Sequence, residues 1–167
     1  MTNKGTIIVL SAVFTAVEVA TVLLGAQVRD VPANNGDNDA FLDTASTSAL
    51  TDEVGKIVAA AFTFTPATVP ATDKAAHDAL TGRATAQYES LYRPLLQQAQ
   101  SKGLNVTTTV RAIGVTALNG DRAQLLVLAD QAAKSTATGQ SDLGPAHLDL
   151  IVERHDGHWK IASIEVL

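Results

Sequence analysis

Residues Leu148–Val166 read LDLIVERHDGHWKIASIEV, an Asp-Gly pair between two stretches that alternate apolar and polar side chains. This pattern predicts two antiparallel strands joined by a two-residue type I′ turn at Asp156-Gly157. Because such a turn fixes the register, Val152 lies opposite Ile161, and Glu153 lies opposite Lys160 as an opposite-charge pair. One face of the hairpin is then apolar and covers the core, through Leu148, Leu150, Val152, Trp159 and Ile161. The other face carries Ile151, Glu153, His155, His158, Lys160, Ala162 and Ile164.

The turn also decides how two closely spaced histidines are interpreted. His155 and His158 face each other at the mouth of the hairpin, in water, and no third ligand is within sequence reach. Zinc sites in proteins use three or four protein ligands. The motif therefore predicts a hairpin, and a surface site made of two histidines is the weaker alternative. The sequence predicts no metal ligand, no cofactor and no catalytic residue.

Upstream of this hairpin, the extended pattern reaches back to residue 104. The stretch LNVTTTVRAIGVTAL (104–118) is rich in β-branched residues and is followed by Asn119-Gly120, a strong hairpin signal. DRAQLLVLADQ (121–131) returns as a second strand. A loop rich in Gly, Ser and Thr, at 135–145, precedes a third strand that starts near Ala146. We therefore expect four antiparallel strands.

Residues 44–103 show the three-to-four-residue period of helices instead. A first helix ends before Pro66 and places on one face Leu50, Val54, Ile57, Val58, Ala61 and Phe62. Thr72 is expected to cap a short second helix that ends at Gly82. A third, longer helix runs to Lys102-Gly103, with a kink or break near Arg93 because Pro94 cannot continue the backbone ladder. Its core face carries Tyr88, Leu91, Leu95 and Ala99.

Helices followed by strands predict an α+β fold, a cone of three helices packed on a curved four-stranded antiparallel sheet.

The composition of the chain excludes several functions. The 167 residues suffice for one domain and an appendage. The formal net charge is -5 and no basic patch is present, so nucleic acid is not an expected partner. The chain has no cysteine, which excludes disulfide frameworks, thiolate zinc sites and thiol catalysis.

An N-terminal transmembrane helix is predicted from TIIVLSAVFTAVEVATVLLGA (6–26), in which Glu18 is the one ionisable residue. At about 1.5 Å per residue this helix crosses the roughly 30 Å hydrocarbon core. Each Ile, Val, Leu and Phe favours insertion by about 0.3–0.6 kcal/mol, which together outweighs the roughly 2.5–3.5 kcal/mol cost of a central carboxylate. A cleaved signal peptide is the alternative, but the run is longer than the about 7–15 apolar residues of such peptides. Lys4 before the helix and Arg29-Asp30 after it indicate a cytoplasmic N-terminus and an extracytoplasmic C-terminal domain.

A carboxyl group at the depth of Glu18 marks a contact or functional site. Ser11, Thr15 and Glu18 share one helix face, and a neighbouring stripe of small residues would let another helix approach. The predicted helix–helix contact comprises Ser11, Ala12, Thr15, Ala16, Glu18 and Ala20. A protonated or snorkelling Glu18 without a partner is the alternative. The chain then divides into an anchor (1–28), an acidic tether (29–43) and an α+β domain (44–167).

Two motifs carry a resemblance to a known family: GVTALNGDRAQLLVLADQ (114–131) and LDLIVERHDGHWKIASIEV (148–166). Together with the anchor and YRPLL (92–96), they make the chain similar to the Mce-associated membrane proteins of actinobacteria, which accompany mammalian-cell-entry (Mce) lipid-import systems. The stretch FTFTPATVPATD (62–73) departs from that pattern and leaves the local helix connection open. The resemblance implies a cone like those of nuclear transport factor and SnoaL-like proteins, and it brings no catalytic residues.

The implied function is that of a non-enzymatic accessory or scaffold protein in the cell membrane. Its implied partners are Mce transporter subunits and membrane lipid, with a homodimer through the sheet as a further expectation. Three alternatives remain: a lipid- or small-molecule-binding cone, a scaffold of a type IV secretion system, and an enzyme like ketosteroid isomerase. An enzyme would need a carboxylate base near a tyrosine donor. The candidates are Asp130, Glu165, Tyr88 and Tyr92.

Overall fold

The computed structural model describes residues 44–167, and the predicted anchor, its contact residues and the tether lie outside this range. Within residues 44–167, four helices precede four strands. The helices are α2 (Thr44–Phe62), α3 (Val69–Ala79), α4 (Gly82–Leu91) and α5 (Arg93–Lys102). The strands are β1 (Leu104–Asn119), β2 (Arg122–Ser135), β3 (Ser141–His155) and β4 (His158–Val166). None of the helices within 44–167 is long and apolar enough to span a membrane.

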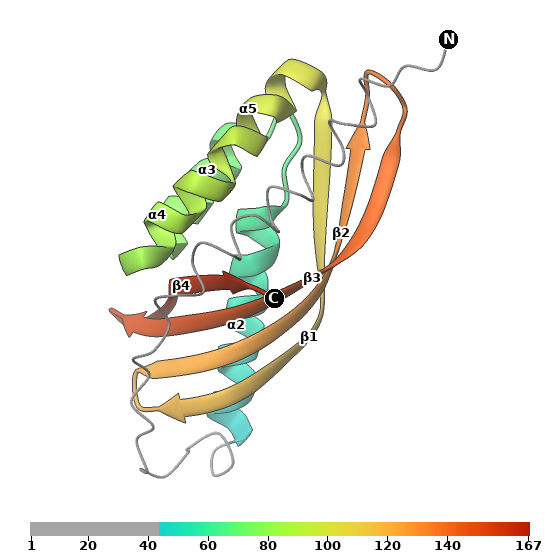
Figure 1. Cartoon of the computed structure of the whole chain (residues 1–167). Helices are drawn as coiled ribbons and strands as arrows, with labels where there is room; N and C mark the ends of the chain where they lie inside the picture. The colour runs from blue at the N-terminus through green and yellow to red at the C-terminus, as the bar shows by residue number, and fades with distance from the viewer. Residues whose placement is uncertain (1–43) are drawn as a thin grey trace.

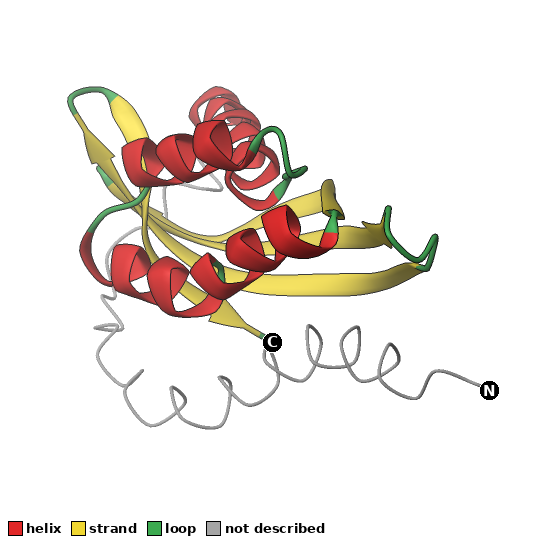
Figure 2. Cartoon of the chain, turned by 90° about the horizontal axis from the view of Figure 1, so that it is seen from above, coloured by secondary structure: helices red, strands yellow, loops and turns green. Residues whose placement is uncertain are grey.

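The strands form one antiparallel meander in the order β1-β2-β3-β4, and they are long and bent in both views (Figure 1, Figure 2). Along β2, alternate residues are buried, so one face of the sheet packs on the helices and the opposite, outer face is open to solvent. The helix α2 packs against β1, and α4 packs against β4. The predicted cone of three helices on a curved four-stranded sheet is confirmed, with the third helix divided in two.

The division of the third helix falls where Pro94 predicts it. The helix α4 ends at Leu91, Tyr92 lies between the two segments, and α5 begins at Arg93 with the proline in its first turn. Proline is tolerated there because the first N–H groups of a helix have no partner within the helix. The helix α5 ends at Lys102 and is capped by Gly103, which has the left-handed conformation with φ 62°.

The expected start and end of the second helix are wrong. The helix α3 begins at Val69, with Pro70 in its first turn, so Thr72 is inside the helix. Thr72 is buried, and its hydroxyl donates to the Thr63 carbonyl at 2.9 Å. The helix stops at Ala79 because Leu80 pairs as a parallel bridge with Ile161 of β4. This contact with the sheet could not be read from the local pattern.

The C-terminal hairpin has the predicted register. Asp156 and Gly157 have φ values of 52° and 83°, as a type I′ turn requires, and His155 pairs with His158. Val152 pairs with Ile161, and the five apolar side chains assigned to the core face are all buried. Glu153 lies opposite Lys160, but its carboxylate forms an ion pair with Arg122 of β2 instead.

A β-bulge changes the register between β3 and β4 on the far side of Val152 from the turn. Ile151 pairs with Ser163 while Val152 pairs with Ile161, so Ala162 is the extra residue. Ile164 consequently lies opposite Leu150 and is buried, which corrects its assignment to the outer face.

The other two hairpins are shifted from the expected positions. The first turn is Gly120-Asp121 rather than Asn119-Gly120, because Asn119 pairs with Arg122. The third strand begins at Ser141, five residues before the expected start. It includes Pro145, which pairs with Asp130 of β2. Proline is tolerated here because β4 pairs with β3 only from Leu148 onward, so Pro145 lies on a free edge.

Side chains and short segments from the helical layer cover parts of both sheet edges. The amide of Gln87 on α4 donates to the carbonyl of Ile164 at 2.8 Å and accepts from its N–H at 3.0 Å. On the other edge, Phe64 exchanges two backbone hydrogen bonds with Val106, both 2.8 Å long. These contacts fix α4 on β4 and fix the end of α2 on β1, and so they set the position of the residues that line the interior.

Candidate functional site

Aromatic side chains fill the space between helices and sheet. Phe62 on α2 lies with its ring centroid 4.7 Å from Tyr92 and 6.1 Å from Tyr88. The two tyrosine rings are stacked, with centroids 5.3 Å apart and planes 3° from parallel. Phe62 and Tyr88 are fully buried. Three large rings in mutual contact therefore pack together between the helices and the sheet.

The polar groups in this interior are all paired with one another. Gln131 on β2 donates to the Thr108 hydroxyl at 3.2 Å and approaches the Tyr92 hydroxyl at 3.5 Å. Thr108 donates to the carbonyl of Phe62 at 2.7 Å, and Tyr88 donates to the carbonyl of Ala61 at 3.3 Å. Within residues 44–167 no buried side-chain nitrogen or oxygen lacks a hydrogen-bond partner. The buried polar side chains of residues 44–167 are therefore held by contacts within the domain itself.

The carboxylates that an enzyme would need lie elsewhere. Asp130 alternates with the inward-facing Gln131, so it points to the outer face of the sheet, where it pairs with Arg111 at 2.7 Å. Glu165 pairs in register with Asp149, also away from the core. Burial raises the pKa of Tyr88 and of Tyr92, so both hydroxyls stay protonated. The structure therefore does not bring the candidate bases together with the candidate tyrosine donors.

The two histidines of the hairpin each face a carboxylate of their own. His155 Nε2 lies 3.7 Å from Glu153, and His158 Nδ1 lies 3.4 Å from Glu53 of α2. Both side chains are well exposed, as expected at the mouth of a turn. They do not converge with a third ligand, which agrees with the interpretation of the motif as a hairpin.

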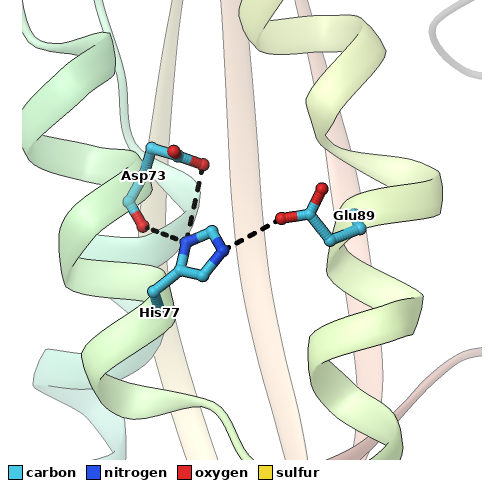
Figure 3. Close-up of side chains that lie close together, drawn as sticks. All are labelled: Asp73, His77 and Glu89. Atoms are coloured by element: carbon cyan, nitrogen blue, oxygen red, sulfur yellow. Dashed lines mark hydrogen bonds and ion pairs between the residues drawn. The ribbon is translucent and has the colours of Figure 1, made fainter.

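A different cluster of metal-ligating side chains was missed by sequence reasoning. Asp73 and His77 lie one turn apart on α3, and Glu89 faces them from α4 (Figure 3). Each residue offers one ligand atom, and these atoms lie within 4.8 Å of one another. The i, i+4 spacing of Asp73 and His77 was visible in the sequence. Glu89 could be added only with knowledge of how the helices pack.

Hydrogen bonds hold the imidazole of His77 at both nitrogens. Nδ1 lies 2.8 Å from the backbone carbonyl of Asp73, and Nε2 lies 3.0 Å from Glu89 Oε1. The bond to the Asp73 carbonyl, followed by the negative charges of Asp73 and Glu89, raises the pKa of His77 above its ordinary value of 6.5. The hydrogen bonds from Arg93 lower the pKa of Glu89. The four residues form a chain of alternating charge on the surface of the helical layer.

Replacing Glu89 with glutamine should lower the pKa of His77 in the metal-free protein. The pair with Glu89 stabilises the charged imidazole, whereas the bond to the Asp73 carbonyl survives the change. Because the pKa of His77 is raised in the folded state, its charged ring contributes fully to the stability of the fold below about pH 6.5. This contribution is lost as the pH rises through the raised pKa. An NMR titration of the imidazole nitrogens measures the shift, with Asp142→Asn as a charge-matched control elsewhere. An unchanged His77 pKa in Glu89→Gln would contradict the assigned pair.

A shallow groove of about 430 Å³ runs between α2 and β1. Its floor is β1 at residues 110–113, where a β-bulge interrupts the pairing with β2. Its α2 side combines small and charged residues: Thr51, Asp52, Gly55, Lys56 and Ala59. On the outer face of the sheet, Leu128 and Leu143 are exposed large apolar side chains. These features offer surface for contact with other molecules.

Neither a protein-family model nor a curated protein sequence matches this chain. Solved structures share its arrangement at low identity. An IcmL-like type IV secretion system protein from Legionella pneumophila has a TM-score of 0.61 at 14% identity, covering 72% of this chain and 91% of that one. The periplasmic domain of DotI has a TM-score of 0.53 at 18% identity, covering 72% and 94%.

A third similar structure belongs to a superfamily whose fold has a name. It is a nuclear transport factor 2 (NTF2-like) superfamily protein from Salmonella enterica serovar Typhimurium, with a TM-score of 0.51 at 10% identity, covering 72% of this chain and 92% of that one. At such identities the likeness concerns the fold alone. Residues 44–167 therefore have the NTF2-like α+β cone that the sequence predicts.

Proposed function

We propose that this chain is a non-enzymatic, membrane-anchored scaffold protein that acts through the surface of an extracytoplasmic NTF2-like domain. The observation that carries this proposal is the filled interior. Phe62, Tyr88 and Tyr92 are in mutual contact between helices and sheet, and the polar groups beside them are paired with one another. A cone whose interior is occupied by its own side chains has its outer surfaces left for recognition.

The finer assignment is an accessory role in an Mce-type lipid or sterol import system. It rests on the two sequence motifs at 114–131 and 148–166, on YRPLL and on the predicted anchor. In this role the chain stabilises or assists the transporter, with Glu18 and the small-residue stripe in contact with a transporter helix. The chain lies in the cell membrane as a single-pass protein, its N-terminus in the cytoplasm and its domain outside.

A type IV secretion scaffold is the second candidate. The similarity in fold to an IcmL-like type IV secretion system protein and to the periplasmic domain of DotI supports it. Both candidates share the same plan, an anchored domain that contacts other proteins. The enzyme alternative is weakened because Asp130 and Glu165 lie on the opposite side of the sheet from the tyrosines.

Crosslinking in native membranes, followed by identification of the captured proteins, tests the proposal. We expect the full chain to capture membrane transport proteins, and we expect Glu18→Ala to lower their recovery several-fold because it removes the polar group of the contact face. Val17→Ala, a neighbouring change on a different helix face, should leave recovery unchanged. Capture of lipid-transport subunits favours the Mce role, and capture of secretion subunits favours the second candidate.

Two further variants separate the anchor from the domain. Leu128→Lys and Leu143→Lys alter the outer face of the sheet without touching the core, since both side chains are exposed. If they reduce capture while Glu18→Ala does not, the contact lies on the domain. If no protein is captured and the domain instead retains a lipid, the scaffold proposal is wrong and the ligand-binding alternative replaces it.

A further inference from the structure

We infer that Asp73, His77 and Glu89 form a binding site for a divalent transition-metal ion of the Zn²⁺ class. The three side chains come from α3 and α4, and the carboxylates of Asp73 and Glu89 lie beside different nitrogens of the His77 ring (Figure 3). Their ligand atoms lie within 4.8 Å of one another. One imidazole nitrogen with two carboxylates is a donor set that suits Zn²⁺ and similar ions, and it does not suit Mg²⁺, which prefers oxygen ligands and water.

The orientation of His77 is that of a metal ligand. Its Nδ1 lies 2.8 Å from the Asp73 carbonyl, to which it donates, and this hydrogen bond fixes the ring and the tautomer. Ligating histidines commonly hold their second nitrogen in this way, because a bond from that N–H to a carbonyl makes the free nitrogen a better ligand. Nε2 then points at Glu89 Oε1. Two electron-rich atoms that face each other require a cation between them, either a proton or a metal ion.

The ligand atoms of His77 and Glu89 need to move only slightly to admit the ion. Ligand atoms at zinc bond lengths of about 2.0–2.1 Å lie about 3.3 Å apart in a tetrahedral site. His77 Nε2 and Glu89 Oε1 are 3.0 Å apart, a few tenths of an ångström from that value. The Asp73 carboxylate lies 3.7 Å from Nδ1 of the same ring, and its ligand atom is within 4.8 Å of the other two, so its side chain must rotate toward Nε2 to become the third ligand.

Arg93 holds the carboxylate of Glu89 in position. Arg93 donates from Nε to one oxygen of Glu89, and from Nη2 to Oε1 at 2.7 Å. Ligating carboxylates are hydrogen-bonded in the same manner. The side chains of His77, Asp73 and Glu89 are 44%, 39% and 30% exposed, so an ion can enter from solvent and the remaining coordination positions are open to water.

The chain offers a matched control. His155 and His158 also lie close together on the surface, yet they face different carboxylates, Glu153 and Glu53. Among the residues that the structure describes, only Asp73, His77 and Glu89 form a cluster of three such ligands. If a metal ion binds merely to exposed histidines, the hairpin pair should bind it as well as His77 does.

Titration of the untagged full-length chain with ZnCl₂ at pH 7.5, followed by calorimetry, tests the site. We expect one ion per chain, affinity at least about tenfold weaker in His77→Gln and in Glu89→Gln, and no competition from MgCl₂. His155→Gln/His158→Gln should bind as the unaltered chain does. The emission of Trp159, the only tryptophan, verifies that each variant is folded.

Three results would overturn the inference. The unaltered chain could bind no Zn²⁺ at millimolar concentration. Glu89→Gln could keep full affinity while His77→Gln loses it, which would mean a lone histidine rather than a cluster. The affinity for Zn²⁺ could instead be lost in the His155→Gln/His158→Gln variant. None of these results would affect the scaffold proposal, which does not depend on a metal.

Discussion

Replacing Phe62 with alanine should lower the free energy of unfolding by about 3–5 kcal/mol, the range for removal of a buried aromatic ring. Phe62 is 1% exposed and contacts both stacked tyrosines, so its removal leaves a cavity where α2, α4 and α5 meet the sheet. Its backbone carbonyl, which accepts from Thr108, is retained in the variant. The expected loss therefore measures packing and not the polar network.

Urea unfolding of the full-length chain, followed by the fluorescence of Trp159, measures this loss. Trp159 is 4% exposed on the core face of β4, so its emission reports on the domain whatever the N-terminal segment does. Leu143→Ala is the control, because a leucine that is 69% exposed should change stability by no more than about 0.5 kcal/mol. Equal losses in the two variants would show that the aromatic cluster is not the centre of the core.

The parts of the fold that depend on local chemistry could be predicted from the sequence. Asp156-Gly157 fixes its hairpin because few residues other than glycine tolerate the φ values of a type I′ turn. Pro94 divides the third helix because it lacks an N–H. Both effects involve neighbouring residues only, and the structure confirms both.

The errors arose where a distant contact overrides the local pattern. The bulge at Ala162 leaves no mark in the alternation of Ile161 to Ile164, yet it turns Ile164 into the core. Leu80 leaves the helical pattern to pair with Ile161 on the last strand of the chain. Pairings of this kind are set by packing and by the free edges of the sheet, and a single sequence does not display them.

The candidate site follows the same division. The alternation along β2 puts Asp130 and Gln131 on opposite faces, but Asp130 stayed a candidate base because the sequence alone does not show which face the tyrosines cover. Glu89 joins Asp73 and His77 only because α4 faces α3, and no spacing within either helix predicts it. Residues within one element were therefore predictable, and residues that meet from two elements were not.

Replacing Gly103 with alanine should cost about 2–4 kcal/mol, from two effects that act at the same atom. Gly103 has φ +62°, a left-handed conformation that is unfavourable for residues with a Cβ. An added Cβ would also lie 2.1 Å from Thr136 Oγ1, so the threonine would have to move. That movement breaks the bond from Thr136 Oγ1 to the Gly103 carbonyl, now 3.0 Å long, which ties the loop between β2 and β3 to the end of α5.

Two comparisons separate backbone strain from the steric clash. Gly120 has a similar φ of +56°, but the position that an added Cβ would take there is open for 4 Å around, so Gly120→Ala should cost only the strain, about 1–2 kcal/mol. In a Thr136→Ala background the clash at Gly103 is absent, and Gly103→Ala should then cost about as much as Gly120→Ala. Urea unfolding of the four variants gives these differences directly. Gly103→Ala could instead lower the free energy of unfolding equally with and without the Thr136 side chain. The loop would then be free to move at Thr136, and the end of α5 would not hold the β2–β3 hairpin in place.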